Sequence, residues 1–203
     1  MANQLSLQER LRMYWRITEL GALTRRYIVI GAFDGALTIV AIVLAALAGA
    51  MLFGVLVSPS EIDILVRAGL SAAVGLALSS GWGAYEAERV ERKKEIQHLE
   101  QQMQRPMDGC MVDSAVRFAT GWASFIHGIA PLPAAILPLI PLMLFPRDFV
   151  FAGFISVSIT MVFLFLLGVW MGRIAKTNIL AGGLRMVIVG LITALICVLI
   201  GAY

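Results

Sequence analysis

The sequence of 203 residues is 60% hydrophobic and only 14% charged, whereas soluble domains are roughly 45–50% apolar and about 25% charged. A transmembrane helix needs about 20 residues, so the chain has room for five or six crossings. This composition excludes a large aqueous enzyme domain and nucleic-acid binding as the main activity, and we expect no enzymatic function. Because Cys110 and Cys197 lie in very different contexts, no disulfide framework is expected.

The N-terminal segment, residues 1–26, predicts an amphipathic helix before the first membrane crossing. Ser6 and Glu9 have the spacing of a capping box, which marks a helix start. Apolar residues then recur at helical spacing between arginines, as is typical of a helix lying in the membrane interface. Packing on the protein's own cytosolic loops is the alternative. The apolar residues are Leu7, Leu11, Tyr14 and Trp15.

Hydropathy predicts five transmembrane helices and therefore an all-α membrane protein. The first two lie in residues 27–85, separated by the sequence Ser-Pro-Ser at 58–60. Nothing breaks the second helix at its end, so it should continue into water within a charged segment, residues 86–113. Residues 114–203 hold the remaining three helices. The first of these contains four prolines in eleven residues, which predicts a kinked or interrupted helix.

The basic residues predict the orientation. Fourteen of the 16 Lys and Arg residues fall on one side of this five-helix arrangement, leaving only Arg67 and Arg147 on the other. Lys and Arg are enriched in cytoplasmic loops. The N-terminus is therefore predicted to be cytosolic and the C-terminus outside.

Asp34 is the main candidate for a transport site. It lies roughly two turns into the first membrane helix, about 10 Å deep at 1.5 Å per residue, where a carboxylate costs at least ~2.5 kcal/mol on insertion scales. Acidic residues at such depth normally face a bundle interior or a water-filled path. The alternative is a packing role, with Asp34 bonded to Thr38 or to a neighbouring helix. Gly31 and Gly35 bracket Asp34 and allow another helix to approach closely.

His127 is a second polar residue within the membrane part, just before the prolines. It is interpreted as a neutral histidine paired to a hydroxyl or a freed carbonyl. A role as metal ligand or proton carrier is the alternative.

The charged segment holds a looser set of candidate metal ligands. Four of its acidic and imidazole side chains recur at helical spacing and should line one water-facing face, although interleaved basic residues are equally typical of a salt-bridged helix. A short stretch with sulfur and carboxylate atoms follows. Carboxylate, imidazole and sulfur ligands together suit a late first-row divalent ion. The candidates are Glu86, Glu88, Glu91, Glu95 and His98, followed by Met107, Cys110 and Met111.

Three stretches resemble the vacuolar iron transporter family. R-R-Y-I-V-I-G-A-F-D-G-A-L-T, residues 25–38, is similar to that family's first-helix signature, and A-L-S-S-G-W-G-A-Y-E-A, residues 77–87, to the end of its second helix. G-L-R-M-V-I-V-G-L-I-T-A-L-I-C-V-L-I-G, residues 183–201, is similar to its closing segment. Together with the proline-rich third helix, the order and spacing of these stretches make the chain similar to members of this family.

The resemblance implies proton-coupled export of Fe²⁺ or Mn²⁺ from the cytosol by a homodimer whose first helices line the metal path. The family's membrane aspartate maps onto Asp34, while its second-helix methionine maps onto Ser80 and the neighbouring Glu or Gly onto Ala84. With Thr38 and His127, Ser80 is placed in the expected transport path. The shortened charged segment indicates a minimal, prokaryotic member in the plasma membrane, with metal ions, protons and lipid as partners and no permanently bound cofactor.

Two rivals remain at this point. The missing methionine leaves room for a different divalent ion. A non-transporting membrane scaffold or metal sensor that keeps the fold is the rival from another class. The two classes differ at Asp34, which a transporter needs in a water-accessible path and a scaffold needs only for packing.

Overall fold

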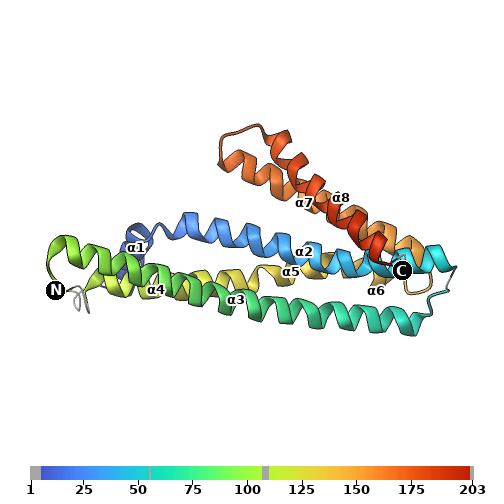
Figure 1. The fold of residues 1–203 in the computed structure, drawn as a ribbon, viewed down its shortest axis with the longest axis horizontal. Helices are drawn as coiled ribbons and strands as arrows, with labels where there is room; N and C mark the ends of the chain where they lie inside the picture. The colour runs from blue at the N-terminus through green and yellow to red at the C-terminus, as the bar shows by residue number, and fades with distance from the viewer. Residues whose placement is uncertain (1–5, 55, 107–109, 202–203) are drawn as a thin grey trace. The chain divides into compact units, whose positions relative to one another are not determined.

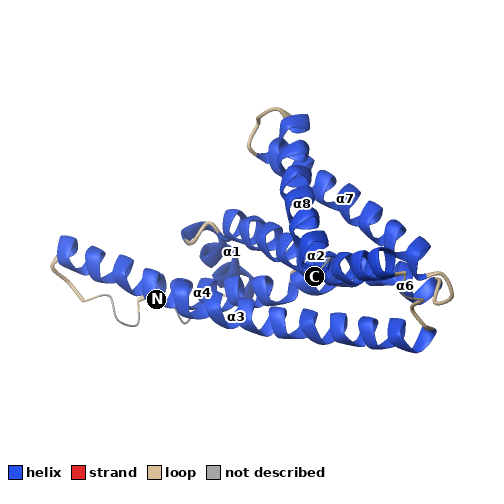
Figure 2. Ribbon diagram, turned by 45° about the vertical axis from the view of Figure 1, so that its right-hand side comes forward, coloured by secondary structure: helices blue, strands red, loops and turns tan. Residues whose placement is uncertain are grey.

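The computed structural model describes residues 6–54, 56–106 and 110–201, and every regular element in these ranges is a helix. Figures 1 and 2 show these helices and the short loops that join them. Five helical stretches are long and apolar enough to cross a membrane. The expected all-α membrane class with five spans is therefore confirmed.

The chain divides into two compact units, which are described separately. The first comprises residues 1–31 and 77–130, and the second residues 32–76 and 131–203. Two long helices, α2 (Leu20–Phe53) and α3 (Pro59–Met103), contribute residues to both.

In the first unit, α1 (Leu7–Ile17) packs on α4 (Met111–Ile129). The predicted capping box is present: the Ser6 hydroxyl accepts from the Glu9 backbone N–H, and the Glu9 carboxylate accepts from the Ser6 N–H at 2.9 Å. The Ser6 hydroxyl also donates to the Glu9 carboxylate at 2.8 Å, and the hydrogen bonds that this carboxylate accepts from the Ser6 hydroxyl and backbone hold the pKa of Glu9 below its ordinary value of 4.5.

The contact between α1 and α4 is aromatic. The Tyr14 and Phe118 rings lie 5.8 Å apart, and Trp15 meets Trp122 edge-on at 6.4 Å. One side of α1 thus rests on the protein itself, although on a helix rather than on the loops considered above. Trp15 and Leu11 are still 47% and 40% exposed, so part of the apolar surface of α1 remains uncovered and can meet a membrane surface.

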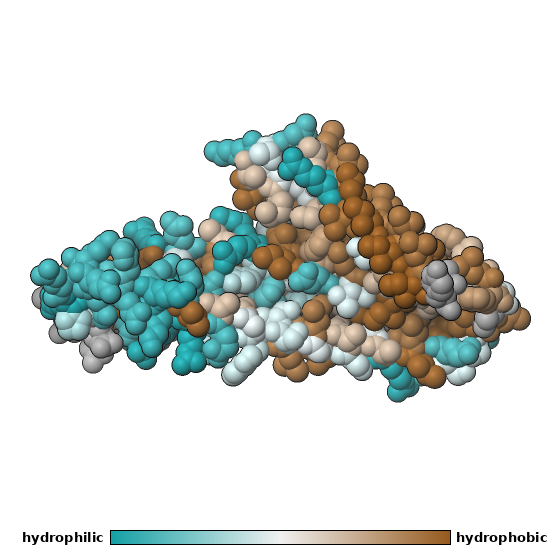
Figure 3. Space-filling view, viewed as in Figure 1, coloured by the Kyte–Doolittle hydropathy of each residue, from teal (hydrophilic) through white to brown (hydrophobic). Residues whose placement is uncertain are grey.

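The second span and the charged segment form one uninterrupted helix, as predicted. α3 runs for 45 residues, and after its first residue no proline or positive backbone φ interrupts it. Figure 3 shows the change in character: teal, hydrophilic residues gather over α1 and the later part of α3, whereas brown, apolar residues cover much of α7 (Phe149–Ile174) and α8 (Ile179–Gly201). The later part of α3 is therefore the part suited to water.

In the second unit, the proline-rich segment is broken into three short pieces. They are α5 (Pro131–Ile136), η2 (Leu137–Leu139) and α6 (Ile140–Leu144), which confirms the predicted interruption. Proline removes a backbone donor and leaves carbonyls to be satisfied elsewhere. The Ser156 hydroxyl of α7 satisfies one of them by donating to the Pro138 carbonyl at 2.6 Å, in a buried position.

The core of the second unit collects side chains from α2, α3, α6 and α7. Val43, Ile62 and Leu142 are at most 2% exposed. α7 and α8 then approach so closely that a Cβ on Gly168 would overlap the backbone of Gly182. Only glycine permits this spacing.

Candidate functional site

Asp34 lies in α2 and is half-buried. The next residue, Gly35, faces α5, where a Cβ would overlap the backbone of Pro131. The close approach predicted around Asp34 is thus made, at Gly35, by a helix of the same chain. Asp34 itself takes part in a polar or electrostatic interaction.

α2 has two distinct faces in the second unit. Ile39, Val40 and Val43 are fully buried and form the inner face. The other face is only half-buried, and it carries Asp34 together with small or polar residues at helical spacing. These are Thr38, Ala41, Ala45 and Gly49.

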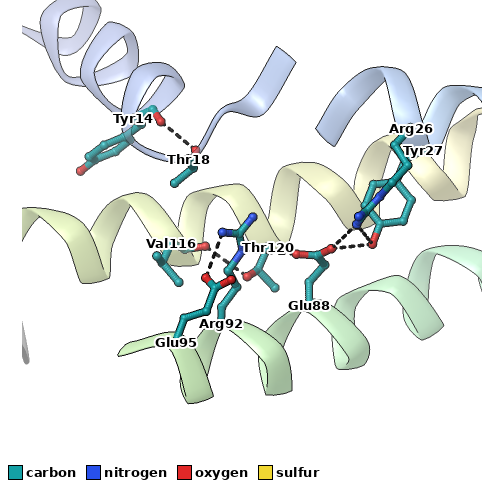
Figure 4. A network of polar contacts seen from close by, with 9 residues as sticks. All are labelled: Tyr14, Thr18, Arg26, Tyr27, Glu88, Arg92, Glu95, Val116 and Thr120. Carbon is teal, nitrogen blue, oxygen red and sulfur yellow. Dashed lines mark hydrogen bonds and ion pairs between the residues drawn. The ribbon is translucent and has the colours of Figure 1, made fainter. Parts of the chain in front are cut away.

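Glu88 is the centre of a network of polar contacts in the first unit (Figure 4). One of its carboxylate oxygens accepts from the Tyr27 hydroxyl at 2.6 Å and from Arg26 Nη2 at 2.9 Å. The other oxygen accepts from Arg92 Nε at 3.3 Å, and Arg92 also binds Glu95 at 3.2 Å. α3 is thereby tied to the beginning of α2.

The expectation that Glu88 faces water with the other acids is wrong. Its side chain is only 10% exposed, because Tyr27 covers it and two arginines neutralise it. Glu91, Glu95 and His98 are exposed, so the water-facing row is real but shorter than predicted.

His127 lies beside Tyr27, whose ring centroid is 4.9 Å from that of the imidazole. Its Nδ1 is 3.4 Å from the Tyr27 backbone carbonyl. A part-buried histidine paired to a carbonyl matches the first of the two interpretations above. Nearby, the Ser124 hydroxyl donates to the Gly81 carbonyl at 2.6 Å, which joins α3 and α4.

Apart from Glu91, the remaining candidate ligands of the charged helix contact side chains of their own helix. Glu86 pairs with Arg89 at 3.6 Å, and the His98 ring nitrogen is 3.0 Å from Gln102. Within the described ranges, no three His, Cys, Asp or Glu side chains gather in a way that suits a metal ion. The salt-bridged alternative therefore accounts for most of this helix in the single chain.

The sulfur-bearing residues Cys110 and Met111 have separate structural positions. Cys110 is the N-cap of α4, where its sulfur accepts from the Asp113 backbone N–H at 3.5 Å. Met111 is half-buried in the first turn of the same helix. Met107 lies outside the described residues.

The two positions that depart from the family pattern lie on α3. Ser80 is half-buried. Ala84 is 6% exposed and packs in an apolar cluster with Ala119 and Ala123 of α4, so this position contributes packing and no ligand atom.

Sequence patterns did not reveal the partners of Glu88. Arg26 and Tyr27 precede it by about sixty positions, and helical spacing reports only on neighbours within a helix. Composition alone could have suggested the contact. An Arg-Arg-Tyr sequence stands at the start of the first membrane helix, and Glu88 stands at the end of the second membrane helix.

Two comparisons with known proteins bear on identity. A model of the VIT family matches residues 109–202, which includes α4 to α8. An uncharacterized protein of the archaeon Methanocaldococcus jannaschii is 30% identical over 179 residues, covering 86% of this chain and 87% of the relative. These matches indicate a multi-pass membrane protein of a family associated with metal-ion transport. The chain therefore belongs to the VIT family, the vacuolar iron transporter family that its sequence resembles.

Proposed function

We propose that this protein exports a divalent transition metal, Fe²⁺ or Mn²⁺, from the cytosol in exchange for protons. Membership of the family supports membrane metal-ion transport as the general function. The observation that supports the finer proposal is the position of Asp34, a carboxylate on the half-buried face of a transmembrane helix.

A carboxylate in this position couples two cations by competition. A divalent ion binds the charged carboxylate, and a proton neutralises it, so each ligand displaces the other. Metal arriving from one side would release a proton, and protonation from the other side would release the metal. This exchange is what an antiporter requires.

The proposed path is completed by a second copy of the chain. The face of α2 that carries Asp34 also carries Thr38, two alanines and a glycine, and small residues allow helices in a membrane to approach closely. In the proposed homodimer, the Asp34 side chains of the two copies flank one path. The distribution of basic residues supports a cytosolic position for the charged part of α3, and transport from that side would be export.

The ligand set bears on the choice of ion. Ser80 replaces the soft methionine sulfur of the family pattern, which leaves the carboxylate of Asp34 as the main proposed ligand. Oxygen ligands suit Mn²⁺ better than softer ions. Transport of a different divalent ion is accordingly the second candidate.

The test is metal uptake into proteoliposomes under an imposed pH gradient, with Fe²⁺, Mn²⁺, Co²⁺, Ni²⁺ and Zn²⁺ compared. Asp34→Asn should keep the fold but lose both transport and metal-linked proton movement, and Asp34→Glu should fall between. Asp63→Asn is the matched control, since Asp63 is exposed and its one ion pair among the described residues is with its own-helix neighbour Arg67, at 2.8 Å. It should transport normally.

Two results would count against this proposal. Wild-type rates in Asp34→Asn at matched expression would remove Asp34 from the mechanism. Absence of uptake for all five ions in the folded wild-type protein would favour the scaffold or sensor instead.

A further inference from the structure

A cavity of the first unit lies between the polar part of α3 and the beginning of α4, and it has a volume of about 580 Å³. Its lining runs along α3 from Tyr85 to Glu100, a distance of about 22 Å at 1.5 Å per residue. Pockets that hold small molecules are typically about 300–1,000 Å³. The cavity is therefore large enough for a ligand of the size of a glycerophosphate group.

The charge of the cavity is positive. Arg89, Arg92, Lys93 and Arg117 line it, against the two acids Asp113 and Glu100. A cavity with two more cations than anions repels a divalent metal ion and attracts an anion. The cavity is therefore poorly suited to admit a metal cation.

The cations differ in how far they are already neutralised. Arg117 binds Asp113 through two contacts, at 3.1 and 3.2 Å, and Arg92 is held by two glutamates. Arg89 has one long contact of 3.6 Å, with Glu86. Lys93 forms no ion pair within the described part of the chain. Arg89 and Lys93, four residues apart on α3, are thus the cations most available to a ligand.

One end of the cavity carries aromatic residues of the kind found at a membrane surface. Tyr85 lines it, and Tyr85 contacts Trp82 with ring centroids 5.7 Å apart. Tyr and Trp concentrate at the headgroup level of a bilayer, and the charged sequence of α3 begins directly after Tyr85. A phosphate group in this part of the cavity could remain attached to acyl chains in the adjoining leaflet.

We propose that this cavity binds the phosphate-bearing headgroup of an anionic phospholipid, with Arg89 and Lys93 as the main contacts. Basic pockets between helices at a membrane surface are suited to such headgroups. The ligand would bridge α3 and α4 in place of a protein side chain. The inference does not depend on which metal is transported or in which direction.

The test uses the purified full-length protein in detergent, titrated with phosphatidylglycerol, with phosphatidylcholine of the same acyl chains, and with inorganic phosphate. Binding is measured by native mass spectrometry and by the shift in the thermal midpoint. Arg89→Gln with Lys93→Gln removes the two available cations. Arg12→Gln with Lys94→Gln is the control, because it makes the same change in charge at exposed residues outside the cavity.

Wild-type protein and the control should bind phosphatidylglycerol more tightly than phosphatidylcholine. The cavity variant should bind phosphatidylglycerol on the order of tenfold more weakly. Equal binding of the two lipids by wild-type protein, or an equal loss in both double variants, would overturn the proposal. Stabilisation by inorganic phosphate that equals that by phosphatidylglycerol, and is lost in the cavity variant, would overturn the lipid assignment in favour of a soluble anion. These readouts require no transport, so they are independent of the function proposed above.

Discussion

Replacing Glu88 by glutamine should destabilise the protein although the two side chains have nearly the same shape. The carboxylate is 10% exposed and accepts bonds from Tyr27, Arg26 and Arg92. Glutamine keeps one oxygen for the Tyr27 hydroxyl but loses the negative charge, and its NH₂ group faces an arginine that also can only donate.

The size of the stability loss depends on whether Arg26 and Arg92 find water or another acid once the charge of Glu88 is gone. Removing one side of a fully buried ion pair costs about 3–5 kcal/mol. Here the Arg26 side chain is 57% exposed and can be rehydrated, and Arg92 retains Glu95. The remaining free-energy cost is mainly the loss of charge-assisted hydrogen bonds, at about 1.5–3 kcal/mol. We expect a loss of about 2 kcal/mol, or a fall in Tm of about 4–8 °C for a chain of this size.

Thermal unfolding followed by circular dichroism in detergent measures this effect. Glu91→Gln is the matched control, since Glu91 is exposed on the same helix and forms no ion pair among the described residues. Tyr27→Phe, alone and combined with Glu88→Gln, completes a double-mutant cycle that should show positive coupling. Equal Tm values for Glu88→Gln and Glu91→Gln would refute the reasoning.

Three further outcomes are expected. Gly168→Ala should lower Tm, because the new methyl overlaps the backbone of α8. Gly121→Ala is the control, since its methyl enters open space and should leave Tm unchanged or raise it. Equal changes in Tm for the two variants would contradict the close packing of α7 and α8. The hydrogen bonds that the Glu9 carboxylate accepts from Ser6 lower its pKa, so the capping box stabilises α1 fully above pH 4.5 and weakens as the pH falls through the lowered pKa. Ser6→Ala should therefore speed amide exchange in the first turn of α1 near neutral pH but not well below pH 4.5. A cysteine introduced at Lys94, after removal of both native cysteines, should be labelled in inside-out vesicles, and protection there would reverse the predicted orientation.

The sequence predicted the helices well because their causes are local. A membrane span is defined by a continuous apolar run, and the 45-residue α3 by the absence of any breaker after Tyr85. The prolines between residues 131 and 141 likewise interrupt the third span by their own geometry. Even the start of α1 was predicted, since a capping box lies within four residues.

The site was predicted less completely because its contacts are not local. The burial of Glu88 depends on Arg26 and Tyr27, which come from another helix. The neighbour of Gly35 is a proline about a hundred positions later. Helical spacing shows which side chains share a face, but which faces meet is decided by tertiary packing.

The edge-on contact of Trp15 with Trp122 gives the protein an optical reporter. Two of its four tryptophans are in this pair, and the Trp122 indole N–H also donates to the Thr24 hydroxyl at 2.9 Å. Indole emission depends on the polarity of the surroundings and on neighbouring groups that quench it. Detachment of α1 from α4, to lie in lipid or in water, would change the emission of both rings. Intrinsic fluorescence can therefore follow the position of the N-terminal helix without an added label.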